Sequence, residues 1–280
     1  MLAAESISTG RERRGLVVRP GEPVPHGPYT RRSPPQEPDV PAAPVIPARF
    51  NGPPVSGNGG YVSGLLADAL GAGPVEVTLR APPPLDVPLA FARREDGTLA
   101  LLDGDRLLAE ARAHAFELDV PAPPGLDAAA AAGVLGRLRA HARTGNPYRR
   151  CFGCGIDRDD GLRILPAPVG EDGVVASDWT PAASLAGDDG LVPAPIVWAA
   201  LDCPAGIAWT HRLPDAPPMM TGRIAARIDV PVRAGARYVA MGWPIAREGR
   251  KLHAGTALVD EAGRVVARSL QLWLLPREAA

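Results

Sequence analysis

The stretch GLVPAPIVWAALDCPAGIAW, residues 190–209, decides how the chain is interpreted. Prolines stand near its start and apolar residues follow, a pattern that predicts a buried helix over residues 193–208. One acidic residue, Asp202, lies in the middle of the apolar run. A buried carboxylate is costly unless it is paired or takes part in chemistry. Asp202 therefore marks either a carboxylate tied to the backbone or to an arginine, or a functional site.

A second stretch, NGGYVSGLLADALG at residues 58–71, predicts another buried helix over residues 60–70. Asn58 suits the cap position of a helix, glycines are accepted beside it, and the final glycine is a typical stop. This opening equally fits a tight turn and cap without any function. Ser63, one turn into the helix, fits either a substrate contact or a small residue packed under a sheet.

Strand patterns follow each predicted helix. The expected strand segments are residues 75–83, 89–104, 106–120, 161–180, 221–235, 237–260 and 264–276. Turn sequences such as Asp96-Gly97 and Glu248-Gly249 lie between them and favour antiparallel hairpins. Each half of the chain thus reads as a loop, one buried helix and a run of antiparallel strands, which indicates an internal duplication.

The pattern divides the chain into four segments. Residues 1–48 are rich in proline and charge, so we expect them to be mostly irregular, with the folded part beginning near Phe50. Residues 49–120 form the expected first unit, residues 121–150 a connector that contains a helix, and residues 151–280 the second unit.

Composition excludes several classes of partner. The 280 residues carry a formal net charge of −1, which provides no field to attract nucleic acid or an anionic membrane. No apolar run reaches the roughly 20 residues that span a bilayer, and the N-terminus lacks the apolar core of a signal peptide. We expect a cytoplasmic protein with no nucleic-acid or membrane partner.

Three cysteines do not suggest a disulfide framework. Cys151 and Cys154 form one CxxC, whereas a zinc site needs four ligands and no second CxxC or nearby histidine pair follows. Cys203 has no histidine at a recognisable position to activate it as a nucleophile, so it reads as a small core residue. The sequence therefore predicts no metal and no cofactor.

One central helix wrapped by antiparallel strands, followed by a second such unit, resembles the hotdog fold, specifically a double hotdog of the acyl-CoA thioesterase superfamily. The segment CFGCGIDRDDGLRI, residues 151–164, resembles the glycine-rich segment before the first strand of hotdog thioesterases of the phenylacetate-pathway kind. NGGYVSGLLAD, residues 58–68, resembles the signature that opens their central helix. The resemblance covers residues 50–276 and implies an α+β fold with two long antiparallel sheets, each wrapping a helix, joined to one another.

The resemblance also implies a composite active site. In such enzymes the helix N-terminus of one unit holds the thioester carbonyl, and a carboxylate on the other unit's helix acts on water or attacks directly. Asn58, Gly59 and Gly60 match the opening of the first helix, and Asp202 matches the carboxylate of the second.

The mirror-related site lacks both parts. In the first helix the carboxylate position falls on Ala67, with Asp68 displaced by one residue, and in the second helix the opening contains Pro195, which has no N–H. One site per chain is therefore expected.

Two functions stay open at this point. The first is hydrolysis of an acyl-CoA or related thioester, with Ser63, Trp198, Arg149 and Arg150 as candidates for substrate binding. The second is a catalytically silent hotdog that binds an acyl or other hydrophobic ligand, or that serves as an assembly module. In either case we expect a homodimer that associates through sheet edges or faces, because exposed edges in such a fold need cover.

Overall fold

The computed structural model describes residues 43–71 and 73–277. Most of the segment expected to be irregular, residues 1–42, lies outside the described residues. The packed part of the described chain starts before the expected Phe50. Ile46 is fully buried in the core, and its carbonyl accepts a hydrogen bond from the Asp86 amide at 2.9 Å.

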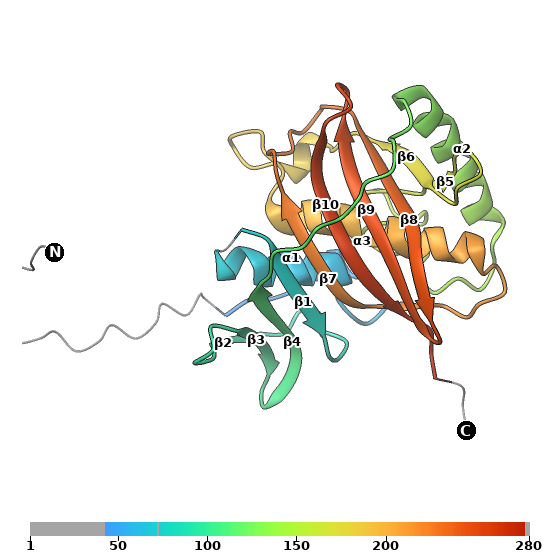
Figure 1. Cartoon of the computed structure of the whole chain (residues 1–280). Coiled ribbons are helices and arrows are strands. Elements are labelled where there is room, and N and C mark those ends of the chain that lie inside the picture. Colours follow the sequence, from blue (N-terminus) through green and yellow to red (C-terminus); the bar gives the residue numbers. More distant parts are fainter. Residues whose placement is uncertain (1–42, 72, 278–280) are drawn as a thin grey trace, which may run out of the picture. The chain divides into compact units, whose positions relative to one another are not determined.

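The described residues contain ten strands in one antiparallel sheet (Figure 1). The strands are β1 (Val75–Leu79), β2 (Ala90–Arg93), β3 (Leu99–Asp103), β4 (Arg106–Ala113), β5 (Ala167–Pro168), β6 (Val175–Trp179), β7 (Met220–Ile228), β8 (Tyr238–Glu248), β9 (Lys251–Asp260) and β10 (Val265–Leu274). Their order is β2-β3-β4-β1-β7-β10-β9-β8-β6-β5. Each strand lies within a predicted segment, except that β7 begins one residue before the predicted start at 221.

The two expected sheets are joined through the pairing of β1 with β7 and are not separate. Val75 lies opposite Ala226 and Thr78 opposite Arg223, so the strands of the two halves form one continuous sheet. The order also has a symmetry about this pair, because β1-β4-β3-β2 runs outward on one side as β7-β10-β9-β8 does on the other.

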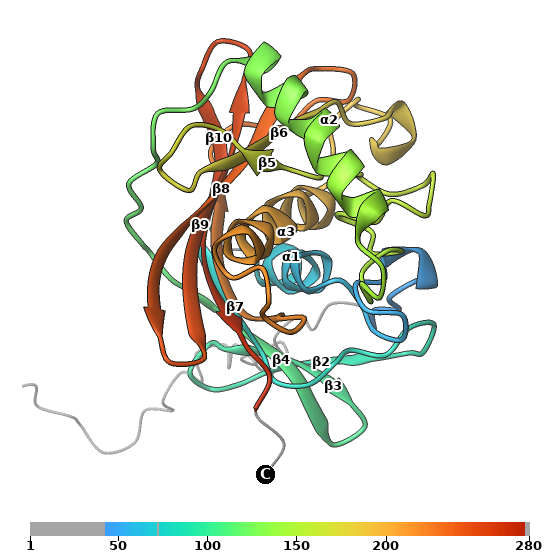
Figure 2. The ribbon, with the colours of Figure 1, turned by 90° about the vertical axis from the view of Figure 1, so that its right-hand side faces the viewer.

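Two helices, α1 (Gly59–Leu70) and α3 (Ala194–Arg212), lie side by side on the concave face of the sheet (Figure 2). Their starts are within one residue of the predicted ones, and α3 continues four residues beyond the predicted end, 208, to Arg212. The core between helices and sheet contains residues of both halves, among them Leu66, Leu99, Leu201 and Leu258.

Glycines let the two helices approach closely. A Cβ on Gly60 would lie 2.4 Å from the Trp198 carbonyl oxygen, and one on Gly64 would lie 2.5 Å from the Cα of Pro195. These distances are shorter than any Cβ tolerates against backbone, so the α1–α3 contact depends on both glycines. The contact places the N-terminus of α1 against the middle of α3.

The outer face of the sheet is partly covered by the chain between β4 and α2 (Leu126–Ala142), the helix expected within residues 121–150. Figure 1 shows the connecting chain, residues 114–125, crossing β10, β9 and β8. Leu118 and Val120 pack there against a cluster that includes Val239 and Met241.

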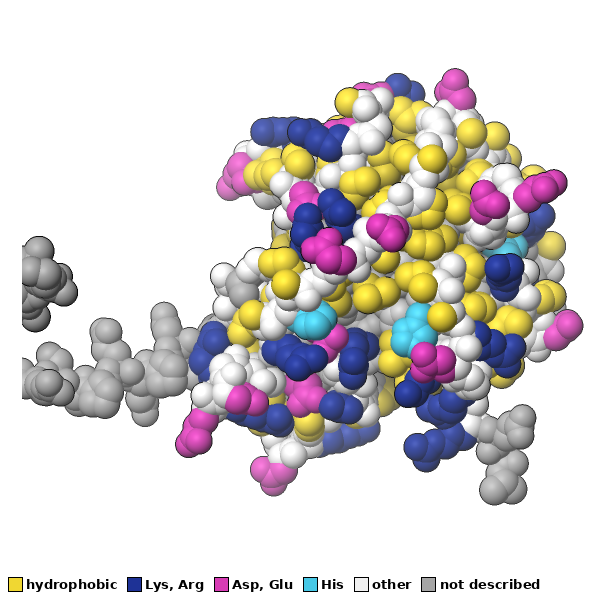
Figure 3. Space-filling view, in the orientation of Figure 1, with side chains coloured by type: hydrophobic (Ala, Val, Ile, Leu, Met, Phe, Trp, Pro, Cys, Tyr) yellow, Lys and Arg dark blue, Asp and Glu magenta, His cyan; other side chains and the backbone are white. Residues whose placement is uncertain are grey.

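Figure 3 shows hydrophobic side chains gathered over this part of the outer face, and charged side chains over β1 and β4. There Glu76 lies near Arg112, His114 and Arg223 at 2.7, 3.7 and 3.8 Å. No helix among the described residues has the length and apolar character needed to cross a membrane.

Candidate active site

Asp202 lies in the middle of α3 with only 2% of its surface exposed. Its Oδ2 accepts hydrogen bonds from the Gly60 backbone amide at 2.9 Å and from the Asn58 side-chain amide at 3.2 Å. Its Oδ1 accepts the Thr221 hydroxyl at 2.8 Å. Both carboxylate oxygens are therefore fixed by donors from α1 and β7, and no arginine pairs with Asp202 in the described part of the chain.

The local sequence explains how α1 presents these donors. Asn58 is the N-cap, in an extended conformation, and its Oδ1 accepts the amide of Tyr61 at 2.9 Å. This leaves its side-chain NH₂ to point at Asp202. The first-turn amides of a helix have no partner inside the helix and carry a partial positive charge, which favours an anion at this end.

Burial dominates the electrostatics of the carboxyl group. Removal from water raises the pKa of Asp202 to about 6, although hydrogen bonds from Gly60, Thr221 and Asn58 oppose that rise. The carboxyl group is thus far more basic than an exposed aspartate, a property typical of catalytic carboxylates and also found in structural ones.

The structure separates the roles of the two glycine amides. The Gly60 amide is used by Asp202, so it is not free for a substrate carbonyl in this arrangement. Gly59 is half-buried, and no hydrogen bond from its amide to another described residue is present. A Cβ on Gly59 would lie 3.2 Å from the Thr221 Cβ, so this amide lies beside Thr221 at the edge of the site.

Thr221 is a residue that sequence reasoning missed. It is the second residue of β7 and lies next to a β-bulge, because β10 pairs Leu272 with Arg223 but Trp273 with Thr221 and so passes over Gly222. Bulges re-aim neighbouring side chains. A single threonine at the start of a strand gives no signal of this kind, although the Thr-Gly pair is visible in the sequence.

The other predicted residues are dispersed. Ser63 is fully buried in α1, and its Oγ has no hydrogen-bond partner among the described residues. Arg149 donates to both carboxylate oxygens of Asp157, at 2.6 and 2.8 Å. Arg150 is exposed and donates to the Asp157 carbonyl at 3.1 Å. Neither arginine contacts Asp202, Asn58 or Gly60.

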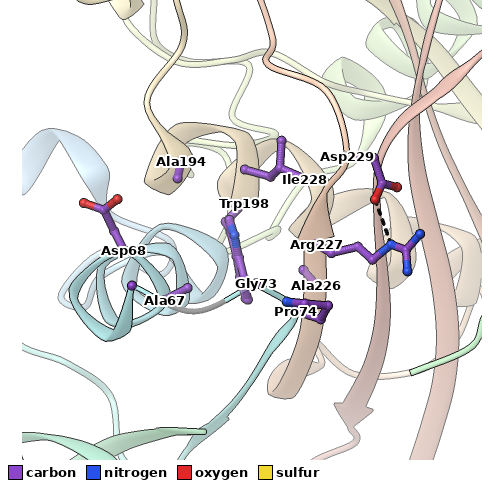
Figure 4. Close-up of a pocket in the computed structure, with 11 residues that line it drawn as sticks. Ala67, Asp68, Gly73, Pro74, Ala194, Trp198, Ala226, Arg227, Ile228 and Asp229 are labelled. Carbon is purple, nitrogen blue, oxygen red and sulfur yellow. Dashed lines mark ion pairs between the residues drawn. The ribbon is translucent and has the colours of Figure 1, made fainter. Parts of the chain in front are cut away.

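A cavity of about 570 Å³ lies away from the carboxylate of Asp202, between the end of α1, the start of α3 and the end of β7. Trp198 is a lining residue, and in the view of Figure 4 its side chain lies between Ala67 and Ala226. Arg227 and Asp229 form an ion pair of 2.9 Å on the same wall. The lining includes Ala67 and Asp68 of α1 and Ala194 at the start of α3, which belong to the helix segments of the expected mirror-related site.

No protein-family model and no curated protein is similar enough in sequence to match the chain. Solved structures are similar in fold. A conserved protein with the hotdog fold from Alicyclobacillus acidocaldarius has a TM-score of 0.55 at 10% identity, over 83% of this chain and 91% of that one. The tesB protein of Mycobacterium avium subspecies paratuberculosis has a TM-score of 0.55 at 14% identity, over 85% and 92% of the two chains.

A protein from Novosphingobium aromaticivorans, named as a thioesterase, has a TM-score of 0.55 at 16% identity, over 84% of this chain and 95% of that one. Each likeness spans nearly the whole neighbour. At these identities the comparison shows the fold, which is the hotdog fold.

Proposed function

We propose that this hotdog-fold protein hydrolyses a thioester of the acyl-CoA kind at a composite site between the N-terminus of α1 and the middle of α3. The observation that carries the proposal is the buried Asp202 carboxylate, held by the Gly60 amide, the Asn58 side chain and the Thr221 hydroxyl. A carboxylate that served only to fill the core would be costlier than an apolar residue. The name thioesterase, carried by several proteins of the same fold, supports this choice of reaction.

In this proposal Asp202 is the general base. It takes a proton from a water molecule as the water oxygen attacks the thioester carbonyl carbon. Negative charge develops on the carbonyl oxygen, where the Gly59 amide and the positive end of α1 stabilise it. The carbon–sulfur bond then breaks, and the proton passes from Asp202 to the departing thiolate, which leaves an acid and a free thiol.

Substrate contacts follow from the surroundings. Arg150 is exposed and can meet the phosphates of coenzyme A, whereas Arg149 is already paired with Asp157. Ser63 and Trp198 are on the two helices that form the site, but Ser63 is fully buried and Trp198 lines the separate cavity, so neither is given a substrate contact in this reaction. The panel of acyl-CoA thioesters described next identifies the preferred acyl chain.

The test is a panel of acyl-CoA thioesters in which free thiol is measured. Asp202→Asn is expected to lower hydrolysis by about 10²-fold or more, the scale of a lost acid–base group. Folding should survive, because the asparagine oxygen can still accept from Gly60 and Asn58 while its NH₂ donates to the Thr221 oxygen. Asp68→Asn, one position from the matching place on α1, is the control and should change the rate little. Equal rates for wild type and Asp202→Asn would exclude Asp202 as the base.

A specific observation favours the alternative, a catalytically silent hotdog that binds an acyl or hydrophobic ligand. The cavity of about 570 Å³ includes Trp198 but not Asp202 among its lining residues. In that case acyl-CoA or a fatty acid binds without turnover, and Trp198→Ala weakens binding. Absence of thiol release across the whole panel, together with saturable binding, would establish this function.

The tandem arrangement belongs to the same proposal. The mirrored strand order around β1 and β7 supports two hotdog units, residues 49–120 and 151–280, joined by residues 121–150. We also propose a homodimer of such chains, which sedimentation at micromolar concentration would test.

A further inference from the structure

All three cysteines of the chain meet at one place beside the proposed active site. Cys151 and Cys154 come from the loop before β5, and Cys203 comes from α3. Their sulfur atoms lie within 4.8 Å of one another, and the Cys151 and Cys203 sulfurs are 3.8 Å apart. Cys151 and Cys203 are buried, and Cys154 is half-buried. The CxxC contributes two of these thiols, and the fold brings the third beside them.

The loop around Cys151 has the geometry of a metal-binding knuckle. The Gly155 amide donates to the Cys151 carbonyl at 2.7 Å and closes a tight turn over the three residues between them. Hydrogen bonds from the thiols of Cys154 and Cys203, and from the backbone amides of Cys154 and Gly153, lower the pKa of the Cys151 thiol. The Asn58 side-chain amide also donates to the Cys151 sulfur, at 3.6 Å. Amides that point at a sulfur stabilise a thiolate, which is the form that binds metal.

Glycines in this loop bring the third sulfur within reach. A Cβ on Gly153 would lie 2.8 Å from the Cys203 sulfur, and one on Gly155 would lie 2.5 Å from the Cys151 carbonyl oxygen. Side chains at either position would therefore push α3 away from the loop or open the turn. The cluster depends on these two glycines.

We propose that Cys151, Cys154 and Cys203 together bind one thiophilic cation, Zn²⁺ or Cu⁺. Zinc–sulfur bonds of about 2.3 Å place two sulfurs of a tetrahedral site about 3.8 Å apart, which is the separation of the Cys151 and Cys203 sulfurs. Small side-chain rotations bring the third sulfur from within 4.8 Å to that spacing. Binding releases the thiol protons.

The two cations share this sulfur chemistry and differ in what else they need. Cu⁺ accepts three thiolates, and thiolates select it strongly. Zn²⁺ takes a fourth ligand, and no histidine or further acidic residue joins the cluster among the described residues. Zn²⁺ carries one more positive charge than Cu⁺. The zinc cluster would therefore have less net negative charge beside the buried Asp202, which lowers the cost of burying these charges. Separate titrations decide between them.

The experiment uses the full-length, reduced, metal-free protein under exclusion of oxygen. Zn²⁺ and Cu⁺ are titrated separately against a chromophoric chelator, and Cd²⁺ is added to record the thiolate charge-transfer band in the ultraviolet. We expect one equivalent of cation with a Kd of about 10⁻⁹ M or lower. A thiol reagent should then find the three cysteines protected.

Cys151→Ser, Cys154→Ser and Cys203→Ser should each weaken binding by at least about 10²-fold. Asp202→Asn keeps all three thiols and is the matched control, so its stoichiometry should stay at one. This control also separates the metal site from the proposed hydrolysis, which Asp202→Asn is expected to lower by about 10²-fold or more.

If a serine variant fails to fold, the Cd²⁺ band of the wild type remains decisive, because its intensity scales with the number of bound thiolates. A band typical of three thiolates supports the site. Binding of neither Zn²⁺ nor Cu⁺ by the reduced protein at micromolar concentrations would overturn the proposal, as would unchanged binding in folded Cys203→Ser.

Discussion

The hydroxyl of Thr221 fixes one oxygen of Asp202 at 2.8 Å, while α1 fixes the other. Its aim depends on the bulge at Gly222, where an added Cβ would lie 2.9 Å from Leu274 Cδ1. Thr221 is therefore a positioning residue in the proposed reaction: it orients the base and leaves the proton transfer to Asp202.

Replacement of this hydroxyl by a methyl group gives a residue-scale prediction. Thr221→Val should lower kcat/KM by roughly 10- to 10²-fold, because a hydrogen bond to a charged group contributes about 1.5–3 kcal/mol. Thr221→Ser keeps the hydroxyl and should restore most of the rate. The measurement is thioester hydrolysis with both variants. A serine variant as slow as the valine variant would show that shape, not the hydrogen bond, matters at this position.

Sequence reasoning at this scale found the residues that the two helices bring into contact. Asp202 stood out because it interrupts an apolar run, and Asn58 and Gly60 stood out as a helix opening; the structure brings all three together. The direct hydrogen bond from the Gly60 amide to Asp202 could not be predicted. It depends on how closely α1 and α3 approach, and the two residues are 142 positions apart in the chain. The same holds for Cys203 and the CxxC loop.

At the scale of elements, α2 packs against the sheet through its small residues. A Cβ on Gly136 would lie 1.8 Å from the Leu165 carbonyl oxygen, and one on Gly133 would lie 2.7 Å from the Asp178 Oδ1. The first obstacle is backbone and cannot move away, whereas the second is the tip of a side chain.

Gly136→Ala should consequently destabilise the protein by about 1–3 kcal/mol, the usual cost of overpacking, even though alanine is the better helix former. Hydrogen exchange should rise over residues 126–142 and in β6. Gly133→Ala is the matched control and should cost less, because the Asp178 side chain can rotate. Equal urea midpoints for the two variants would mean that α2 is not held by this glycine contact.

Helix and strand positions followed from local patterns in most cases. The apolar runs and turn sequences predicted α1, α3 and the long strands, because each buries one regular face. The end of α3 was placed four residues early, and α3 continues through Pro204 to Arg212. A proline is normally read as disruptive within a helix, and here packing against the sheet keeps α3 continuous.

At the scale of the whole molecule, the two halves share a hydrophobic core around α1 and α3, and the second half has a further cluster of its own. One hydrophobic cluster contains residues of both halves, α1 contacts α3, and β1 pairs with β7. The sequence indicated which residues form strands and that the sheets of the two halves join, but not that β1 and β7 are the strands that pair.

A shared core predicts one cooperative unfolding transition for residues 43–277. All five tryptophans lie between residues 179 and 273, and four of them report on the second half, while Trp198 also lies against α1. Hydrogen exchange of α1 and β4 reports on the first half. The two urea midpoints should coincide. Midpoints that differ clearly would show that the halves unfold as separate units.

The ends of the sheet bear on self-association. A long sheet presents unpaired backbone groups at its two outer strands, and these can recruit strands of other molecules. Here one outer strand, β5, is only two residues long and ends in Pro168, which has no N–H to offer, and the other, β2, has four residues. Addition of a strand to the sheet is therefore blocked at β5, and β2 offers only a short strand for pairing. A second copy of the chain would have to associate through a face, and the protein should resist fibril formation at high concentration.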